Sequence, residues 1–188
     1  MKGKILRTAA ALSAAAFLIA PVRAAEPSIR AQSAILMDAE SGRVLYELDA
    51  DTRSRIASTT KIMTCLVALE HSELTEQVTV KREHLREGSS MYLLEGETLT
   101  MEELLYGLML PSGNDAAECI AAHCGGSGGS KQFIAWMNEK AASLGMMHTA
   151  FLNPSGLDES GHDSCALDMA RLAAYAMQNP TFARIVST

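Results

Sequence analysis

The stretch at residues 56–70 reads I-A-S-T-T-K-I-M-T-C-L-V-A-L-E, a pattern that predicts a buried helix beginning beside a reactive serine. Ser58 lies at the expected N-terminus of this helix, and Lys61 follows three residues later. Residues at i and i+3 share one helical face, so the Lys61 amine can reach the Ser58 hydroxyl. A serine is a weak nucleophile unless a base lies beside it, and a buried lysine with a lowered pKa can be that base. The apolar helix supplies the burial, and its positive dipole end lies near Ser58.

The same pattern has an ordinary explanation. Serine and threonine commonly cap helices, and lysine is common within them. From average residue usage, a Ser-x-x-Lys spacing occurs by chance roughly once in a few hundred residues. The interpretation of Ser58 and Lys61 as a catalytic pair therefore depends on the rest of the chain.

The first 24 residues have the composition of a secretory signal peptide. Lys2, Lys4 and Arg7 precede an alanine-rich apolar run of about 13 residues. We expect cleavage near Ala24; the alternative is an uncleaved anchor, for which the run is short. Cleavage changes the formal charge from −6 to −10, because four basic residues and no acid are lost. We therefore expect an exported protein, in the cell envelope or periplasm, that binds neither nucleic acid nor an anionic membrane surface.

The cysteines and histidines predict neither a metal site nor a cofactor. Export permits disulfides, but the cysteine spacing fits no metal motif, and we expect buried free thiols with one disulfide as the alternative. The five histidines show no ligand spacing, and we expect them at the surface or capping helices. The residues concerned are Cys65, Cys119, Cys124, Cys165, His71, His84, His123, His148 and His162.

The hydrophobic pattern predicts an α+β fold, with a helical block against an antiparallel sheet. Residues 33–38 are expected to form a strand, residues 39–42 have turn composition, and the alternation over residues 43–48 favours the return strand of a hairpin. Thr100 and Glu103 have the spacing of a capping box, and the glycine-rich residues 125–130 are expected to be a flexible connection. A sheet of two strands alone is marginally stable, so we expect this fold to need further strands that the sequence does not contain. The other expected elements are a short strand at 77–80 and helices at 100–110, 116–123, 131–144 and 166–177.

A second group of polar residues interrupts the helical block. Ser112-Gly113-Asn114 follows a proline, and a tight break there would project both polar side chains into a cleft. The Ser112 hydroxyl could pass a proton between Lys61 and a leaving group, and the Asn114 amide could bind a substrate amide and the Lys61 amine. The alternative is a helix C-cap and turn. Taken together, Ser-x-x-Lys and Ser-x-Asn are motifs of penicillin-interacting active sites.

The residues that flank these motifs carry a more specific resemblance. I-A-S-T-T-K-I-M-T, G-E-x-L-T-x-E-E-L-L-Y-G-L-M-L-P-S-G-N-D-A-A and F-x-N-P-S-G-L-D resemble the low-molecular-weight penicillin-binding proteins that are serine-type D-alanyl-D-alanine carboxypeptidases. The resemblance covers about residues 33–186 and implies the penicillin-binding protein / β-lactamase-like transpeptidase fold. It implies that Ser58 is the acyl-forming nucleophile and Lys61 its base. It also implies that Ser112 is catalytic and that Asn114 binds substrate.

The implied reaction removes the terminal D-alanine from peptidoglycan stem peptides through an acyl-enzyme on Ser58. β-Lactams mimic the dipeptide and are the implied covalent inhibitors. Neither metal nor cofactor is needed. Membrane association is expected only if a C-terminal anchor exists beyond this chain.

The chain departs from the family pattern in one respect, because no Lys-Thr-Gly occurs in its 188 residues. We therefore expect residues 25–188 to be an incomplete catalytic domain, truncated before the later sheet strands, with impaired turnover. Two alternatives are a class A-like β-lactamase and a non-catalytic fragment that binds peptidoglycan. A third is an exported helical domain without catalytic function.

Overall fold

The computed structural model describes residues 27–188, so the expected signal peptide lies outside the described residues. The chain divides into two units, Met1–Ala31 and Gln32–Thr188. Residues 27–31 of the first unit form neither helix nor strand. All elements named below belong to the second unit. No helix of the described part is long and apolar enough to cross a membrane.

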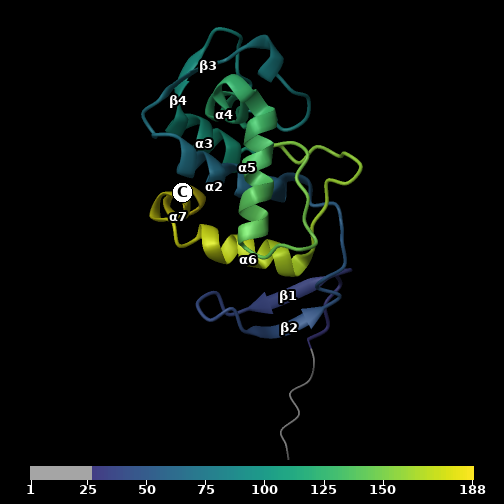
Figure 1. Ribbon diagram of the computed structural model, residues 1–188. Helices are drawn as coiled ribbons and strands as arrows, with labels where there is room; N and C mark the ends of the chain where they lie inside the picture. Colours follow the sequence, from purple (N-terminus) through teal and green to yellow (C-terminus); the bar gives the residue numbers. More distant parts are fainter. Residues whose placement is uncertain (1–26) are drawn as a thin grey trace, which may run out of the picture. The chain divides into compact units, whose positions relative to one another are not determined.

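The second unit begins with the predicted hairpin (Figure 1). Strand β1 (Ala34–Met37) pairs antiparallel with β2 (Val44–Leu48), and the register shifts between Leu36 and Met37. Gly42 in the connecting turn has φ +71°, which glycine adopts without steric cost. The predicted hairpin at residues 33–38 and 43–48, with its turn at 39–42, is therefore confirmed.

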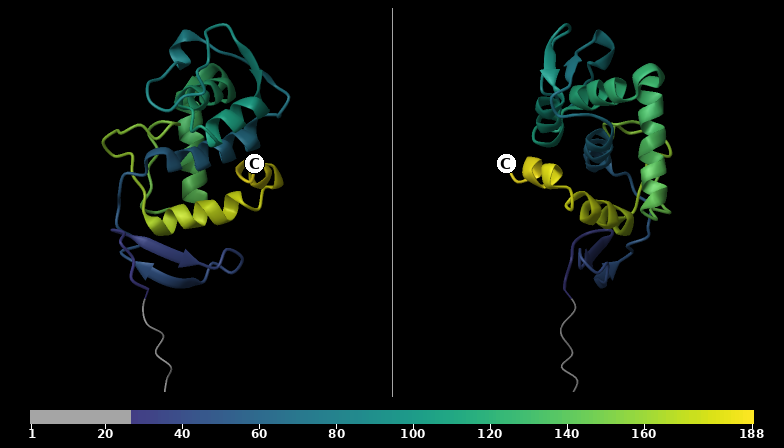
Figure 2. Two further views of the ribbon diagram at one scale, coloured as in Figure 1. Left: turned by 180° about the vertical axis from the view of Figure 1, so that it is seen from behind. Right: turned by 60° about the vertical axis from the view of Figure 1, so that its left-hand side comes forward.

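A central helix organises the rest of the unit (Figure 2). Helix α2 (Lys61–His71) follows a short 3-10 helix, η1 (Ala57–Thr60), and contacts each of the other five α-helices found in residues 32–188. Its side chains are buried from residue 63 to 68, because helices surround it on several sides. The surrounding helices are α3 (Met101–Met109), α4 (Asn114–Cys124), α5 (Gly129–Ser143), α6 (Ala166–Ala176) and α7 (Pro180–Val186).

A second small sheet lies before α3. Strand β3 (Gln77–Thr79) was predicted, and it pairs antiparallel with β4 (Thr98–Thr100), which sequence reasoning assigned to the start of a helix. The predicted capping box is present: Thr100 Oγ1 accepts from the Glu103 amide, and the Glu103 carboxylate accepts from the Thr100 amide. A short 3-10 helix, η2 (Arg82–His84), lies between the two strands.

The expectation of a flexible connection at residues 125–130 is wrong. Residues Gly126–Gly128 form a 3-10 turn, η3, and α5 begins at Gly129. The Gly125 amide donates to Ala121 O and the Gly128 amide to Gly125 O, so backbone hydrogen bonds tie the turn to α4. The glycines are used for a tight helix-to-helix connection rather than for flexibility.

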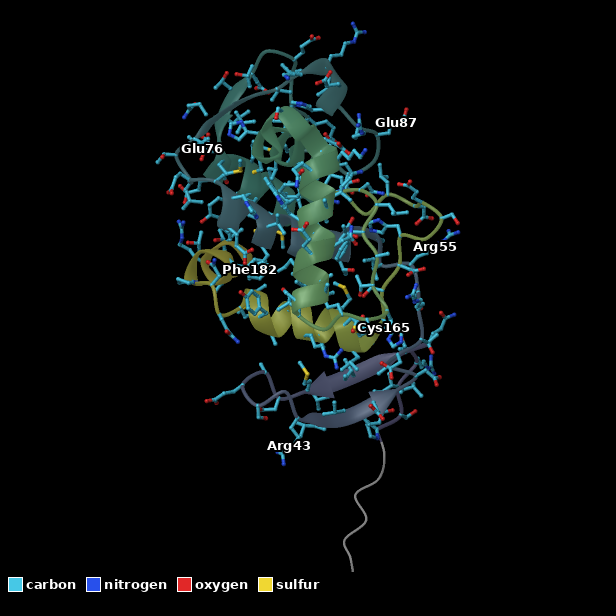
Figure 3. All side chains as sticks on the ribbon, in the orientation of Figure 1. Arg43, Arg55, Glu76, Glu87, Cys165 and Phe182 are labelled. Atoms are coloured by element: carbon cyan, nitrogen blue, oxygen red, sulfur yellow. The ribbon has the colours of Figure 1, made fainter. Side chains whose placement is uncertain are left out.

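The thiols agree with the expectation of free cysteines. All four are unpaired; Cys65, Cys119 and Cys165 are buried, and Cys124 is partly exposed. Figure 3 shows Cys165 at the start of α6 and Phe182, a core residue, on α7.

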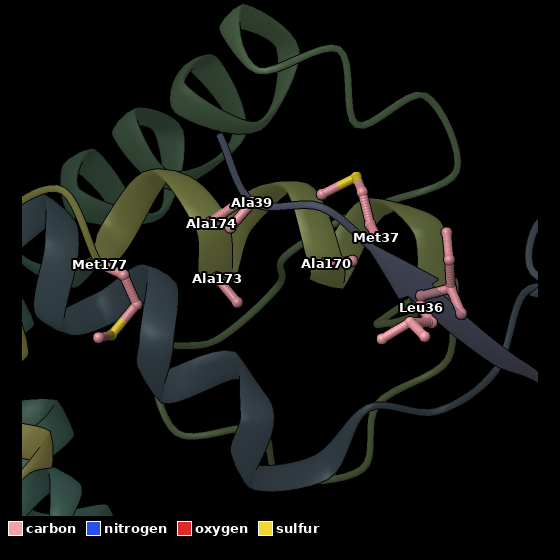
Figure 4. A pocket seen from close by; sticks show the side chains of 8 residues that line it. Leu36, Met37, Ala39, Ala170, Ala173, Ala174 and Met177 are labelled. Atoms are coloured by element: carbon pink, nitrogen blue, oxygen red, sulfur yellow. The ribbon is translucent and has the colours of Figure 1, made fainter. Parts of the chain in front are cut away.

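A cavity of about 320 Å³ lies between the hairpin and α6 (Figure 4). Leu36 and Met37 of β1 line one side, and Ala170 and Ala173 of α6 line the other. None of the predicted site residues lines this cavity.

Candidate active site

The serine predicted as nucleophile lies on η1, one turn before the central helix. Ser58 is exposed, whereas Thr60 and Lys61 beside it are buried. Gly156 lies against the backbone of Ala57, the residue before Ser58. Its φ is +86°, and a Cβ added to it would lie 1.9 Å from the Ala57 carbonyl oxygen. The loop around Gly156 therefore packs against the backbone that carries Ser58, and only glycine fits there.

Lys61 is 2% exposed and uses its ammonium group for three hydrogen bonds. Its Nζ donates to Ser58 Oγ at 3.2 Å, to Asn114 Oδ1 at 2.9 Å and to the Ser155 carbonyl oxygen at 2.6 Å. Burial lowers the pKa of Lys61 to about 8, and the negative charge of Asp115 partly opposes this shift. At pH 7 about a tenth of the lysine is therefore neutral and able to accept a proton.

Asn114 is the first residue of α4, and both its side-chain amide and its backbone amide make hydrogen bonds. Its Nδ2 donates to the Glu87 carbonyl at 2.8 Å, and its backbone amide donates to the Ser89 carbonyl at 2.8 Å. A carbonyl beside Nδ2 and an ammonium beside Oδ1 together fix which way the amide faces. Nδ2 makes no second hydrogen bond among the described residues.

Ser112 lies in the predicted break between α3 and α4. Its φ is +62°, a left-handed conformation that is uncommon for residues other than glycine. Its Oγ is buried and has no hydrogen-bond partner among the described residues. The structure thus brings Ser58, Lys61 and Asn114 into one hydrogen-bonded group, and no hydrogen bond joins the Ser112 hydroxyl to it.

Sequence reasoning missed two residues that support this group. The Ser155 carbonyl accepts the shortest Lys61 hydrogen bond, and a backbone acceptor leaves no signal in residue identity. The buried Asp115 carboxylate accepts from the amides of Met91 and Leu93, each at 3.1 Å. Burial alone would raise the pKa of Asp115, but its hydrogen bonds outweigh this and lower it. The sequence feature that could have indicated a role for Asp115 is its position directly after the Ser-x-Asn motif.

The expectation that the histidines lie at the surface or cap helices is wrong for His162. This side chain is buried; its Nδ1 accepts from the Leu152 amide at 3.0 Å, and its Nε2 lies 2.8 Å from Thr60 Oγ1. Because Nδ1 accepts, Nε2 carries the proton and donates to Thr60. The contact joins the loop before α6 to Thr60, the residue directly before Lys61.

Comparison with known proteins places this geometry in a family. A family model described as D-alanyl-D-alanine carboxypeptidase matches residues 20–187. D-alanyl-D-alanine carboxypeptidase DacF of Bacillus subtilis is 36% identical over 88% of this chain and 44% of its own length. DacC of Escherichia coli is 40% identical over 89% of this chain and 46% of its own length. The chain thus spans about half the length of these two relatives.

Solved structures show the same fold. The DD-transpeptidase of Streptomyces K15 superposes with a TM-score of 0.83 at 36% identity, over 88% of this chain and 67% of that one. The D-alanyl-D-alanine carboxypeptidase of Mycobacterium tuberculosis H37Rv gives a TM-score of 0.83 at 36% identity, over 90% and 65%. The predicted penicillin-binding protein fold is therefore confirmed. By its match to the family model over residues 20–187, the chain belongs to the D-alanyl-D-alanine carboxypeptidase family.

Proposed function

We propose that the protein is a serine-type D-alanyl-D-alanine carboxypeptidase that removes the terminal D-alanine from peptidoglycan stem peptides. The observation that carries this proposal is the set of three hydrogen bonds made by Lys61. A buried amine with a pKa of about 8, 3.2 Å from an exposed hydroxyl, is suited to take the proton of that hydroxyl. Family membership supports the same reaction class.

In the proposed reaction neutral Lys61 takes the proton of Ser58 as Oγ attacks the carbonyl carbon of the penultimate D-alanine. The peptide C–N bond then breaks, and the departing D-alanine amine receives a proton. Water hydrolyses the ester and restores the Ser58 hydroxyl. Ser112 would relay a proton from Lys61 to the leaving amine; its hydroxyl has no hydrogen-bond partner among residues 27–188, so it would have to turn toward Lys61 when substrate binds. Asn114 would bind a substrate carbonyl through its remaining amide hydrogen.

The proposal extends to inhibitors and location. β-Lactams would acylate Ser58 because they present a reactive amide in place of the dipeptide. The basic start and apolar run of residues 1–24 support export to the cell envelope or periplasm. Stem peptides of the wall are found in that compartment.

The test is intact-mass spectrometry of the full chain after exposure to benzylpenicillin. We expect one covalent penicilloyl adduct, lost in Ser58→Ala and retained in Ser127→Ala, which removes an exposed serine of η3. Release of D-alanine from a peptide ending in D-Ala-D-Ala, measured on the same samples, tests the substrate; we expect this release to be slow because the 188 residues contain no Lys-Thr-Gly. Fast penicillin hydrolysis without a lasting adduct would favour a class A-like β-lactamase. Peptidoglycan binding without any adduct would favour a non-catalytic fragment.

A further inference from the structure

Three side chains that could bind a metal converge at the start of α6, where Figure 3 shows Cys165. His148 Nδ1 lies 3.7 Å from an Asp51 carboxylate oxygen and 3.9 Å from Cys165 Sγ. The three potential ligand atoms all lie within 4.8 Å of one another. We propose that Asp51, His148 and Cys165 bind a divalent metal ion of the zinc class, with a water molecule as fourth ligand.

The separations suit such an ion after small side-chain movements. Ligand distances of about 2.0 Å for oxygen and nitrogen and about 2.3 Å for sulfur place tetrahedral ligands about 3.3–3.6 Å apart. His148 is thus within about 0.4 Å of the required separation from each of the other two ligands. The Asp51 side chain is 67% exposed, so it can rotate to bring its carboxylate to the required distance from Cys165 Sγ.

The chemistry of the three ligands selects the ion. A thiolate and an imidazole favour zinc-like metals, whereas calcium and magnesium prefer ligands that are all oxygen. A thiolate and a carboxylate together carry two negative charges, which a divalent ion neutralises. Within the described residues the Asp51 carboxylate has no other ion-pair or hydrogen-bond partner, so its charge is available to the metal.

The backbone around each ligand is already ordered. Ala50, next to Asp51, accepts from the Leu167 amide at 3.0 Å, and Ser54 and Ser164 exchange two hydrogen bonds of 2.8 and 3.1 Å. Ala150, two residues after His148, exchanges hydrogen bonds of 2.9 and 3.3 Å with Asp163. Little backbone freedom would therefore be lost when the metal binds.

A second layer of contacts fixes the Cys165 sulfur and the backbone of His148. Asp168 is fully buried; its amide donates to Cys165 Sγ at 3.5 Å, and its carboxylate accepts from the His148 amide at 2.8 Å. Arg171 pairs with the other Asp168 oxygen at 3.1 Å. Outer contacts of this kind hold metal ligands in position. The bound metal would fasten the segment that precedes Ser58 to the start of α6.

The test uses the full chain, reduced and stripped with a chelator, and Co²⁺ as the spectroscopic probe. We expect one Co²⁺ per chain, with a thiolate-to-metal charge-transfer band and the strong visible bands of a tetrahedral site, both lost on addition of Zn²⁺. Cys165→Ser should lose the charge-transfer band while it folds, because serine is a good N-cap. Cys119→Ser, which removes another buried thiol beside a histidine, should keep it.

Asp51→Asn supplies a second measurement on an exposed residue whose replacement leaves the core intact. We expect Zn²⁺ affinity to fall at least about tenfold, since even loss of an outer contact has that effect. The absence of a charge-transfer band in the unmodified chain, or its persistence in Cys165→Ser, would overturn the proposal. Unchanged affinity in Asp51→Asn would overturn the three-ligand site.

Discussion

The Lys61 ammonium lies 2.9 Å from Asn114 Oδ1, although 53 positions separate the two residues in sequence. The partner is a neutral amide, so it accepts a hydrogen bond without adding a negative charge. A carboxylate at this distance would favour the protonated amine. The choice of amide therefore helps to keep the pKa of Lys61 at about 8.

The first prediction concerns the pH dependence of Ser58 acylation. The rate should rise with pH and reach half its plateau near pH 8, because only the neutral Lys61 amine accepts the proton. In Asn114→Asp the midpoint should move upward by about 1–3 pH units, as for an ion pair at this range. Stopped-flow or mass-spectrometric acylation rates with a penicillin measure both profiles. Asn179→Asp is the control: Asn179 caps α7, where aspartate caps equally well, and its profile should match that of the unmodified chain.

The second prediction concerns stability at alkaline pH. The folded pKa of Lys61, about 8, lies below its unfolded value of 10.5, so the unfolded chain binds more protons between these limits. The contribution of Lys61 to the unfolding free energy is therefore lowest below pH 8 and grows as pH rises toward 10.5. Relative to Lys61→Met, the unmodified chain should gain up to ~3 kcal/mol across this window. Urea unfolding of both proteins at several pH values measures the difference, and parallel curves would contradict the shifted pKa.

The third prediction uses two glycines with nearly equal φ. Gly156 (φ +86°) and Gly96 (φ +89°) carry the same backbone penalty when replaced, but a Cβ on Gly96 meets nothing within 4 Å. Gly96→Ala should cost about 1–2 kcal/mol of unfolding free energy. Gly156→Ala should cost about 1–3 kcal/mol more, since its Cβ overlaps the Ala57 carbonyl. It should also slow acylation of Ser58, whereas Gly96→Ala should not. An equal loss of unfolding free energy in the two variants would show that the close contact of Gly156 with the Ala57 carbonyl does not affect stability.

The parts of the fold that sequence predicted are those set by local rules. The alternation in the hairpin, the capping box of Thr100 and Glu103, and the three-residue spacing of Ser58 and Lys61 each depend on neighbouring residues, and each is present. The prediction of a flexible connection at residues 125–130 was wrong because glycine is common both in flexible segments and in tightly packed turns. Strand β4 was missed because its three residues overlap the signal of the helix that follows.

The long-range contacts of the site were beyond local rules. Lys61 and Ser155 are 94 positions apart, and Thr60 and His162 are 102 apart. Residue types alone predict neither contact. The acceptor for Lys61 is a backbone carbonyl, which any residue has, and the histidines show no metal-ligand spacing that would mark His162. The family resemblance implied that Ser58 and Asn114 lie together, whereas no residue pattern pairs Thr60 and Lys61 with the loop before α6.

The last prediction concerns His162 at acid pH. Burial lowers the pKa of His162 from its ordinary value of 6.5, although Glu159, Asp163 and Asp158 oppose this shift. Protonation of Nδ1 would remove the acceptor of the Leu152 amide and place a charge in the buried contact with Thr60. Because the unfolded chain binds the proton more readily, the unfolding free energy should fall as pH drops below 6.5.

His162→Asn isolates this contribution, because its Oδ1 can still accept from the Leu152 amide and does not titrate. We expect the variant to be less stable at pH 7.5, having lost the contact with Thr60, but to lose less stability between pH 7.5 and 5. The buried His84, whose pKa burial also lowers, contributes to the slope that remains. Urea unfolding across this range measures both proteins. An equal acid slope in the two would mean that His162 keeps its hydrogen bonds when charged and does not couple the loop to the serine helix.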